Sequence, residues 1–156
     1  MAVFVGHPIV VGDTDDIHDT EVVKVLTRAK DANGNEYIFL KGVASTVAGS
    51  WVAYDEQAVT ALLDTDVAAT LVSPIAVAQA AIVANKYGWY MIFGSCSAGA
   101  ATVVDNTKVF STATAGVCDD TGTAGNQIIG AYWRSADSSS LATVQLTYPV
   151  SGVNVA

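Results

Sequence analysis

The segment GDTDDIHD, residues 12–19, holds the densest group of metal-binding residue types in the chain. The candidate ligands are Asp13, Asp15, Asp16, His18 and Asp19. Carboxylate oxygens of this kind bind calcium and similar cations. The spacing departs from that of an EF-hand loop, because Ile17 takes a ligand position and no glutamate closes the loop. Since charge clusters usually face water, a solvated acidic loop is the alternative, and we assign no metal ligand here.

Nucleophilic catalysis has one candidate, Cys96 in the small-residue stretch GSCSAG. A triad needs a histidine and an orienting acid beside the nucleophile, and the chain has only His7 and His18. Nothing near Cys96 in sequence would activate its thiol. The pair Asp119-Asp120 precedes Thr-Gly and indicates a turn. No GxSxG, P-loop or GxGxxG motif is present. We therefore expect no catalytic residue, no cofactor and no enzyme.

Composition limits the classes of partner. Of 156 residues, 51% are hydrophobic and only 14% are charged, against roughly 25% in average soluble domains. The net charge is −8, and residues 1–66 hold eleven acids and four bases. Nucleic-acid backbones and anionic membrane surfaces both require clustered lysine and arginine, which this chain lacks. We expect neither partner, and instead a β-rich protein with much buried or partner-covered surface.

Three further features of the sequence concern targeting, membranes and thiols. The first ten residues lack the positive region of a secretory signal. The uncharged window 67–85 is interrupted by Pro74 and rich in alanine, so we expect no membrane span. Cys96 and Cys118 lack CxxC spacing and a histidine cluster, which makes zinc improbable. The sequence leaves open whether the two thiols pair.

The first half of the chain has a clear hairpin pattern. Residues 21–43 alternate between apolar and charged positions, and Asn33-Gly34 favours the positive φ of a tight turn. The letters DANGNE around it resemble a calcium loop but are better explained by that turn. Residues 50–56 predict a further strand. For residues 57–64 the alanine and leucine content predicts a short helical turn.

The stretch KYGWYMIFGSC, residues 86–96, places five apolar residues between Gly88 and Gly94. This length favours a strand buried on both faces. A subunit interface is the main alternative and an exposed stacking platform a minor one. Farther on, Val144, Leu146 and Tyr148 alternate with polar residues, as in a half-buried strand. Short strands with frequent turns predict a mainly β fold, a small β-barrel or β-sandwich of short antiparallel strands with at most short helices.

The motifs KYGWYMIFG, AGVCDD, GNQIIGAYWRSA and VQLTYP together resemble the capsid decoration, or cement, proteins of tailed bacteriophages. The likeness covers about residues 74–150, and its motifs are structural. The resemblance implies a viral structural protein in the virion, on the outer capsid surface, that bridges subunits of the major capsid protein and often forms a homotrimer. It carries over no catalytic, cofactor-binding or metal-binding residue.

The resemblance also frames the domain organisation. We expect a single β-rich domain over residues 1–156, with residues 1–20 as an extended arm that contacts the capsid and residues 74–150 as the barrel core. Within the arm, residues 2–11 are expected to order on binding, since termini are commonly loose until docked. The alternative function is a tail-fibre or surface carbohydrate-binding module, in which Trp51, Trp89, Trp133 and nearby tyrosines stack on sugars.

Overall fold

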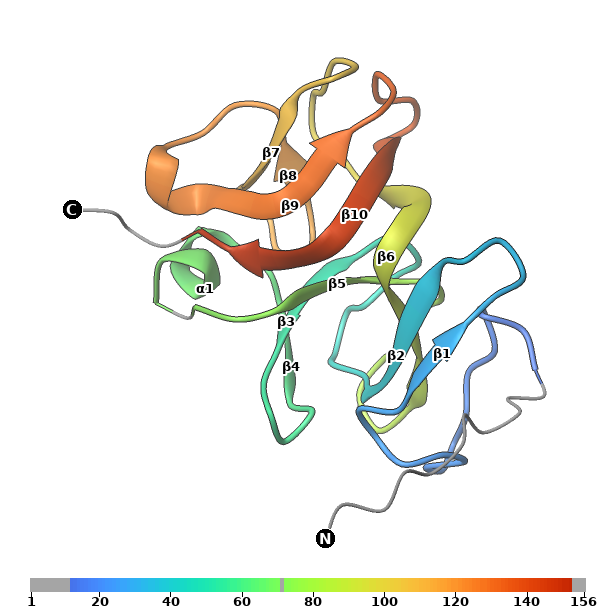
Figure 1. Ribbon diagram of the computed structural model, residues 1–156. Coiled ribbons are helices and arrows are strands. Elements are labelled where there is room, and N and C mark those ends of the chain that lie inside the picture. The colour runs from blue at the N-terminus through green and yellow to red at the C-terminus, as the bar shows by residue number, and fades with distance from the viewer. Residues whose placement is uncertain (1–11, 71, 153–156) are drawn as a thin grey trace, which may run out of the picture.

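The computed structural model describes residues 12–70 and 72–152, and in them the regular secondary structure is almost entirely β-strand (Figure 1). The strands are β1 (Arg28–Lys30), β2 (Glu36–Lys41), β3 (Trp51–Tyr54), β4 (Thr60–Leu62), β5 (Ile75–Ala78), β6 (Tyr87–Gly99), β7 (Lys108–Ser111), β8 (Cys118–Asp119), β9 (Gln127–Trp133) and β10 (Leu141–Ser151). They form one curled antiparallel sheet in the order β4-β3-β5-β6-β10-β9-β7-β8, with β2 and then β1 added beside β6. The predicted mainly β class is confirmed.

The predicted hairpin is β1 and β2, joined through the Asn33-Gly34 turn. Gly34 has φ 84°, which the turn requires. The Asp31 carboxylate accepts hydrogen bonds from the amides of Asn33 and Asn35 at 2.8 and 3.0 Å and from the Tyr37 hydroxyl at 3.0 Å. The first strand is shorter than the sequence pattern predicts, because Leu26 adopts φ 68° and leaves the extended conformation.

Strand β6 belongs to both apolar clusters of the molecule. Trp89 and Met91 point into the larger cluster, and Tyr90 and Ile92 point into the smaller one on the opposite face. Its first half pairs with β2 and β5, and its second half pairs with β10. The prediction of a buried strand around residues 88–94 is therefore confirmed, since both faces of this stretch are covered.

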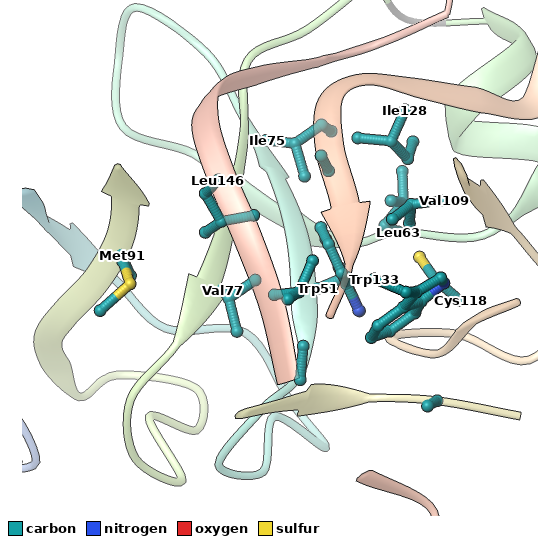
Figure 2. Packing of buried hydrophobic residues seen from close by; sticks show 14 of the residues in the cluster. Trp51, Leu63, Ile75, Val77, Met91, Val109, Cys118, Ile128, Trp133 and Leu146 are labelled. Carbon is teal, nitrogen blue, oxygen red and sulfur yellow. The ribbon is translucent and has the colours of Figure 1, made fainter. Parts of the chain in front are cut away.

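Two tryptophans occupy the centre of the larger cluster (Figure 2). The rings of Trp51 and Trp133 meet edge to face, with centroids 5.9 Å apart and an interplanar angle of 80°. Each indole N–H reaches a backbone carbonyl at 3.1 Å, that of Gly99 for Trp51 and that of Asp119 for Trp133. Because buried indoles need such partners, these bonds fix both rings and tie β3 and β9 to the rest of the sheet.

The predicted helical turn over residues 57–64 is wrong. A turn follows β3 because the Asp55 carboxylate accepts the amides of Gln57 and Val59, and Ala58 adopts φ 62°. The chain returns as β4 beside β3. The only α-helix in the described residues, α1 (Thr65–Thr70), begins one residue after Asp64, whose carboxylate accepts the Val67 amide at 2.8 Å as an N-cap.

The sheet curls until its far ends approach one another. Near β8, the Gly116 amide donates to the carbonyl of Leu63, the residue after β4, at 2.7 Å. The larger cluster draws on β2 and β3 as well as on residues 74–150. Residues 1–11 of the predicted arm lie outside the described residues. None of the described helices is long and apolar enough to cross a membrane.

Candidate functional site

The acidic segment of residues 12–19 contacts both its own backbone and the start of β6. Asp16 accepts the Asp13 amide through its carboxylate at 3.0 Å. Asp19 pairs with Lys86, which lowers the pKa of the Asp19 carboxyl chiefly through their hydrogen bond. His18 bridges to Tyr87 through the backbone, with amide-to-carbonyl distances of 2.9 Å in both directions. Across residues 12–70 and 72–152, no three or more histidine, cysteine, aspartate or glutamate side chains gather as metal ligands.

Both cysteines are free thiols placed among apolar groups. Cys118 is fully buried in the larger cluster, and Cys96 packs against that cluster from β6. Burial raises the pKa of the Cys96 thiol to about 12 and that of Cys118 well above its usual value. Since the thiolate is the nucleophile, neither side chain is set up for nucleophilic chemistry at neutral pH. His7 lies outside the described residues.

Asp119 and Asp120 also accept hydrogen bonds from other parts of the chain. Asp119 accepts the Trp133 indole through its carbonyl, and Asp120 accepts the Val104 amide through its carboxylate at 2.9 Å. Asp119 ends β8, and the chain bends at Asp120. The Asp119 carboxylate accepts the amide of Asp120 at 2.7 Å, so the two carboxyls contact different backbone amides in the described residues.

The tryptophans named for sugar stacking are not at the surface. Relative exposure is 0% for Trp51, 3% for Trp89 and 0% for Trp133. Stacking on a sugar requires one open aromatic face, so these three side chains cannot provide the platform of a carbohydrate-binding module.

One hollow in the described part of the molecule has a volume of about 540 Å³. It lies between the β3–β4 hairpin and the ends of β2 and β6, and its walls include Val25, Val43, Val59 and Tyr87, with Lys41 and Glu21 among the polar residues. Its volume falls in the range of ligand pockets.

A surface of another kind lies on the outer face of β9 and β10, which run side by side at the top of Figure 1. Ile129, Tyr132, Tyr148 and Val150 are 37–48% exposed. Ile129 and Val150 are direct partners across the two strands. On a half-buried sheet the outer positions are normally polar, so this apolar and aromatic group is unusual for a face in contact with water.

The outward position of Tyr148 depends on a β-bulge in β10. The register of β10 against β9 shifts between Leu146 and Val150, and within this shift Tyr148 adopts φ 51°. On β9, Gly130 has φ 82°, and a Cβ there would lie 2.8 Å from the Thr147 carbonyl oxygen. A bulge of this kind re-aims side chains, and here it turns Tyr148 outward. The positive φ costs a tyrosine conformational energy that the surrounding structure must offset.

Tyr148 is held in place by neighbours from two other strands. Its ring packs on Phe93 of β6 with centroids 5.2 Å apart. Its hydroxyl hydrogen-bonds to Glu36 of β2, which raises the pKa of Tyr148. Glu36 is buried and pairs with Lys30 at 2.6 Å, and this hydrogen bond lowers the pKa of the Glu36 carboxyl. We call Phe93, Ile129, Tyr148 and Val150, with the adjoining cations Arg28 and Lys30, the bulge patch.

Sequence reasoning missed this patch and misplaced its central residue. Strict alternation puts Tyr148 on the same face as Val144 and Leu146. Those two residues are fully buried as predicted, but Tyr148 is 48% exposed, because the bulge shifts the chain by one residue. The signals that could have found it are Pro149, which cannot donate a ladder hydrogen bond, and the glycine at position 130.

Known proteins offer no guide to this surface. No family model matches the chain, and no curated protein matches it.

Proposed function

We propose that this chain is a viral structural protein that binds the outside of an assembled phage capsid and cements it by bridging major capsid protein subunits. The observation that carries the proposal is the outer face of β9 and β10, where apolar side chains meet solvent on a rigid sheet. Contiguous exposed apolar groups mark interaction surfaces. The resemblance of residues 74–150 to decoration proteins supplies the identity of the partner.

The arrangement of the conspicuous reactive residues fits a role without chemistry. Both thiols are unactivated, and the acid pair at residues 119–120 supports the backbone. The outer face of β9 and β10 offers contact area, and the core beneath it contains two hydrogen-bonded tryptophans. Rigid contact area is what a clamp requires, because ordering loose segments on binding costs free energy.

The cementing effect follows from the thermodynamic linkage between binding of the chain and assembly of the shell. A protein that binds the assembled shell and not its separated subunits stabilises the shell by the free energy of that binding. Homotrimers would strengthen the effect, since several sites engaged at once raise the effective affinity without any new contact. The major capsid protein and further copies of this chain are the partners we propose, without nucleic acid or membrane.

Shell stability tests the function directly. Empty shells assembled from the major capsid protein of the same source are heated with and without the purified chain, and shell disruption is followed by light scattering. We expect a higher disruption temperature that rises with the concentration of the chain until the sites are filled. An unchanged temperature at concentrations far above that of the capsid subunit would contradict the proposal. Serum albumin at equal mass controls for crowding.

A further inference from the structure

The bulge patch has the composition of a binding hot spot. Such sites are enriched in tyrosine and arginine, surrounded by weaker apolar contacts that exclude water. Here the aromatic anchor is Tyr148, the apolar surround is Phe93, Ile129 and Val150, and the cations are Arg28 and Lys30. Four strands from distant parts of the sequence, together with β1, contribute these side chains and the carboxylate that orients them.

The conformation of Tyr148 gives a second, independent reason to assign a role to this place. A glycine at position 148 would adopt φ 51° without strain, and so would satisfy the bulge better than tyrosine. The aromatic ring is nearly half exposed, so burial does not account for its presence. Strained residues that fold stability does not require are found at functional sites.

The charges of the patch define what it fits. Lys30 pairs with Glu36 at 2.6 Å, whereas Arg28 forms no salt bridge within residues 12–70 and 72–152. Arg28 hydrogen-bonds to Tyr54 and lies near enough to Glu36 to lower the pKa of that carboxyl as well. The patch therefore carries one cation in excess. Asp55 and Glu56 line the same hollow as Arg28, so an anion with several charges would meet more repulsion there than a single carboxylate. A single carboxylate among apolar side chains complements this surface, and a nucleic acid does not.

We propose that the bulge patch is the capsid-docking site, and that it receives an apolar segment of the major capsid protein that presents one carboxylate to Arg28. The identity of the partner rests on the function proposed above. Tyr148 is the anchor that inserts between the apolar side chains of that segment, and Glu36 and Phe93 hold its ring in position.

Two matched pairs of variants test the assignment by binding to the same empty shells. Tyr148→Gly removes the anchor and relieves the strained φ, whereas Val104→Gly removes an apolar side chain of similar exposure that lies outside β9 and β10. Arg28→Glu reverses the unpaired cation, whereas Lys108→Glu reverses an exposed cation on β7. We expect Tyr148→Gly and Arg28→Glu to weaken binding by roughly thirtyfold or more, as hot-spot losses do, and the two controls to stay within roughly threefold.

Folding is checked on the same samples. Tyr148→Gly should unfold at or close to the wild-type temperature, because the relieved strain offsets the lost contact with Phe93. If it unfolds much earlier, Arg28→Glu, which changes an exposed side chain, decides the outcome in its place.

The contact itself is identified by replacing Tyr148 with the photo-crosslinker p-benzoylphenylalanine and sequencing the cross-linked peptide from decorated shells. A capsid segment that carries an aspartate or glutamate among apolar residues supports the inference. Cross-linking to a second copy of this chain overturns it, and so does equal shell binding by wild type and Tyr148→Gly; the cementing function survives both results. Failure of the wild type to bind shells overturns the proposed function, and the partner named here with it.

Discussion

The two faces of β10 differ in whether buried and exposed residues follow strict alternation. On the inner face, Val144 and Leu146 are fully buried against the tryptophan-centred core, as alternation predicts. On the outer face, the bulge interrupts alternation and exposes Tyr148 and Val150. The inner face therefore stabilises the fold through ordinary packing. The outer face carries a local strain that packing does not require, and this difference identifies where binding is expected.

The largest effect should come from the inner face. Leu146→Ala removes a fully buried side chain and leaves a cavity, so the free energy of unfolding should fall by about 2–5 kcal/mol. Thr143→Ala, on the exposed side of the same strand, should change it by no more than about 0.5 kcal/mol. Urea unfolding followed by tryptophan fluorescence measures both. Similar losses of unfolding free energy for the two variants would contradict the proposed difference between the faces.

The bulge itself should be the next most sensitive element. Gly130→Ala places a Cβ 2.8 Å from the Thr147 carbonyl oxygen at φ 82°, so we expect a loss of about 1–3 kcal/mol and weakened shell binding. Gly34→Ala is the matched control, since φ is 84° there but nothing lies within 4 Å of the added Cβ. It should lose stability through strain alone and keep full shell binding. Denaturant unfolding and the shell-binding assay separate the two, and an unaffected Gly130→Ala would contradict the bulge account.

The thiol of Cys96, which packs against the larger cluster, should react slowly with alkylating reagents. With a pKa of about 12 in place of 9.0, Cys96 has roughly a thousandfold smaller thiolate fraction at pH 8. Alkylation by iodoacetamide, followed by mass spectrometry, should therefore be slower than in the urea-unfolded chain by a factor of that order. A rate at or above that of the unfolded chain would restore Cys96 as a candidate nucleophile.

The smallest effect is expected on the melting temperature at low pH, through the pair of Glu36 with Lys30. Because Lys30 lowers the pKa of Glu36 in the folded state, this carboxylate stabilises the fold above its unfolded pKa near 4.5. The contribution is lost as pH falls through the lower folded pKa. Between pH 6 and pH 3 the melting temperature of the wild type should drop more than that of Glu36→Gln, as measured by circular dichroism. Parallel pH curves for the two proteins would show that the pair does not contribute.

Local patterns determined most of what could be predicted about the fold. The hairpin through Asn33-Gly34 and the buried strand at residues 88–94 follow from turn chemistry and from runs of apolar residues. The error at residues 57–64 arose because alanine and leucine favour helix only weakly, whereas the Asp55 turn and the pairing of β4 with β3 decide the conformation. The exposure of Tyr148 depends on Gly130 in another strand, so a periodicity rule applied to β10 alone could not find it.

Residue chemistry gave even less information about the site. The acids of residues 12–19 and the two cysteines are the most reactive types in the chain. In the structure Asp16 accepts a backbone amide, Asp19 pairs with Lys86, and the thiols lie among apolar groups. The residues of the bulge patch carry no catalytic signature. They become a candidate site only once three-dimensional pairing places β1, β2, β6, β9 and β10 together.

The most direct test of the central claim is the copy number of this chain in gradient-purified particles from its source, measured by quantitative mass spectrometry against the major capsid protein. The account predicts a fixed stoichiometry close to one copy per capsid subunit. A handful of copies per particle would place the chain in the tail or fibres, and its absence from particles would contradict a role in the capsid altogether.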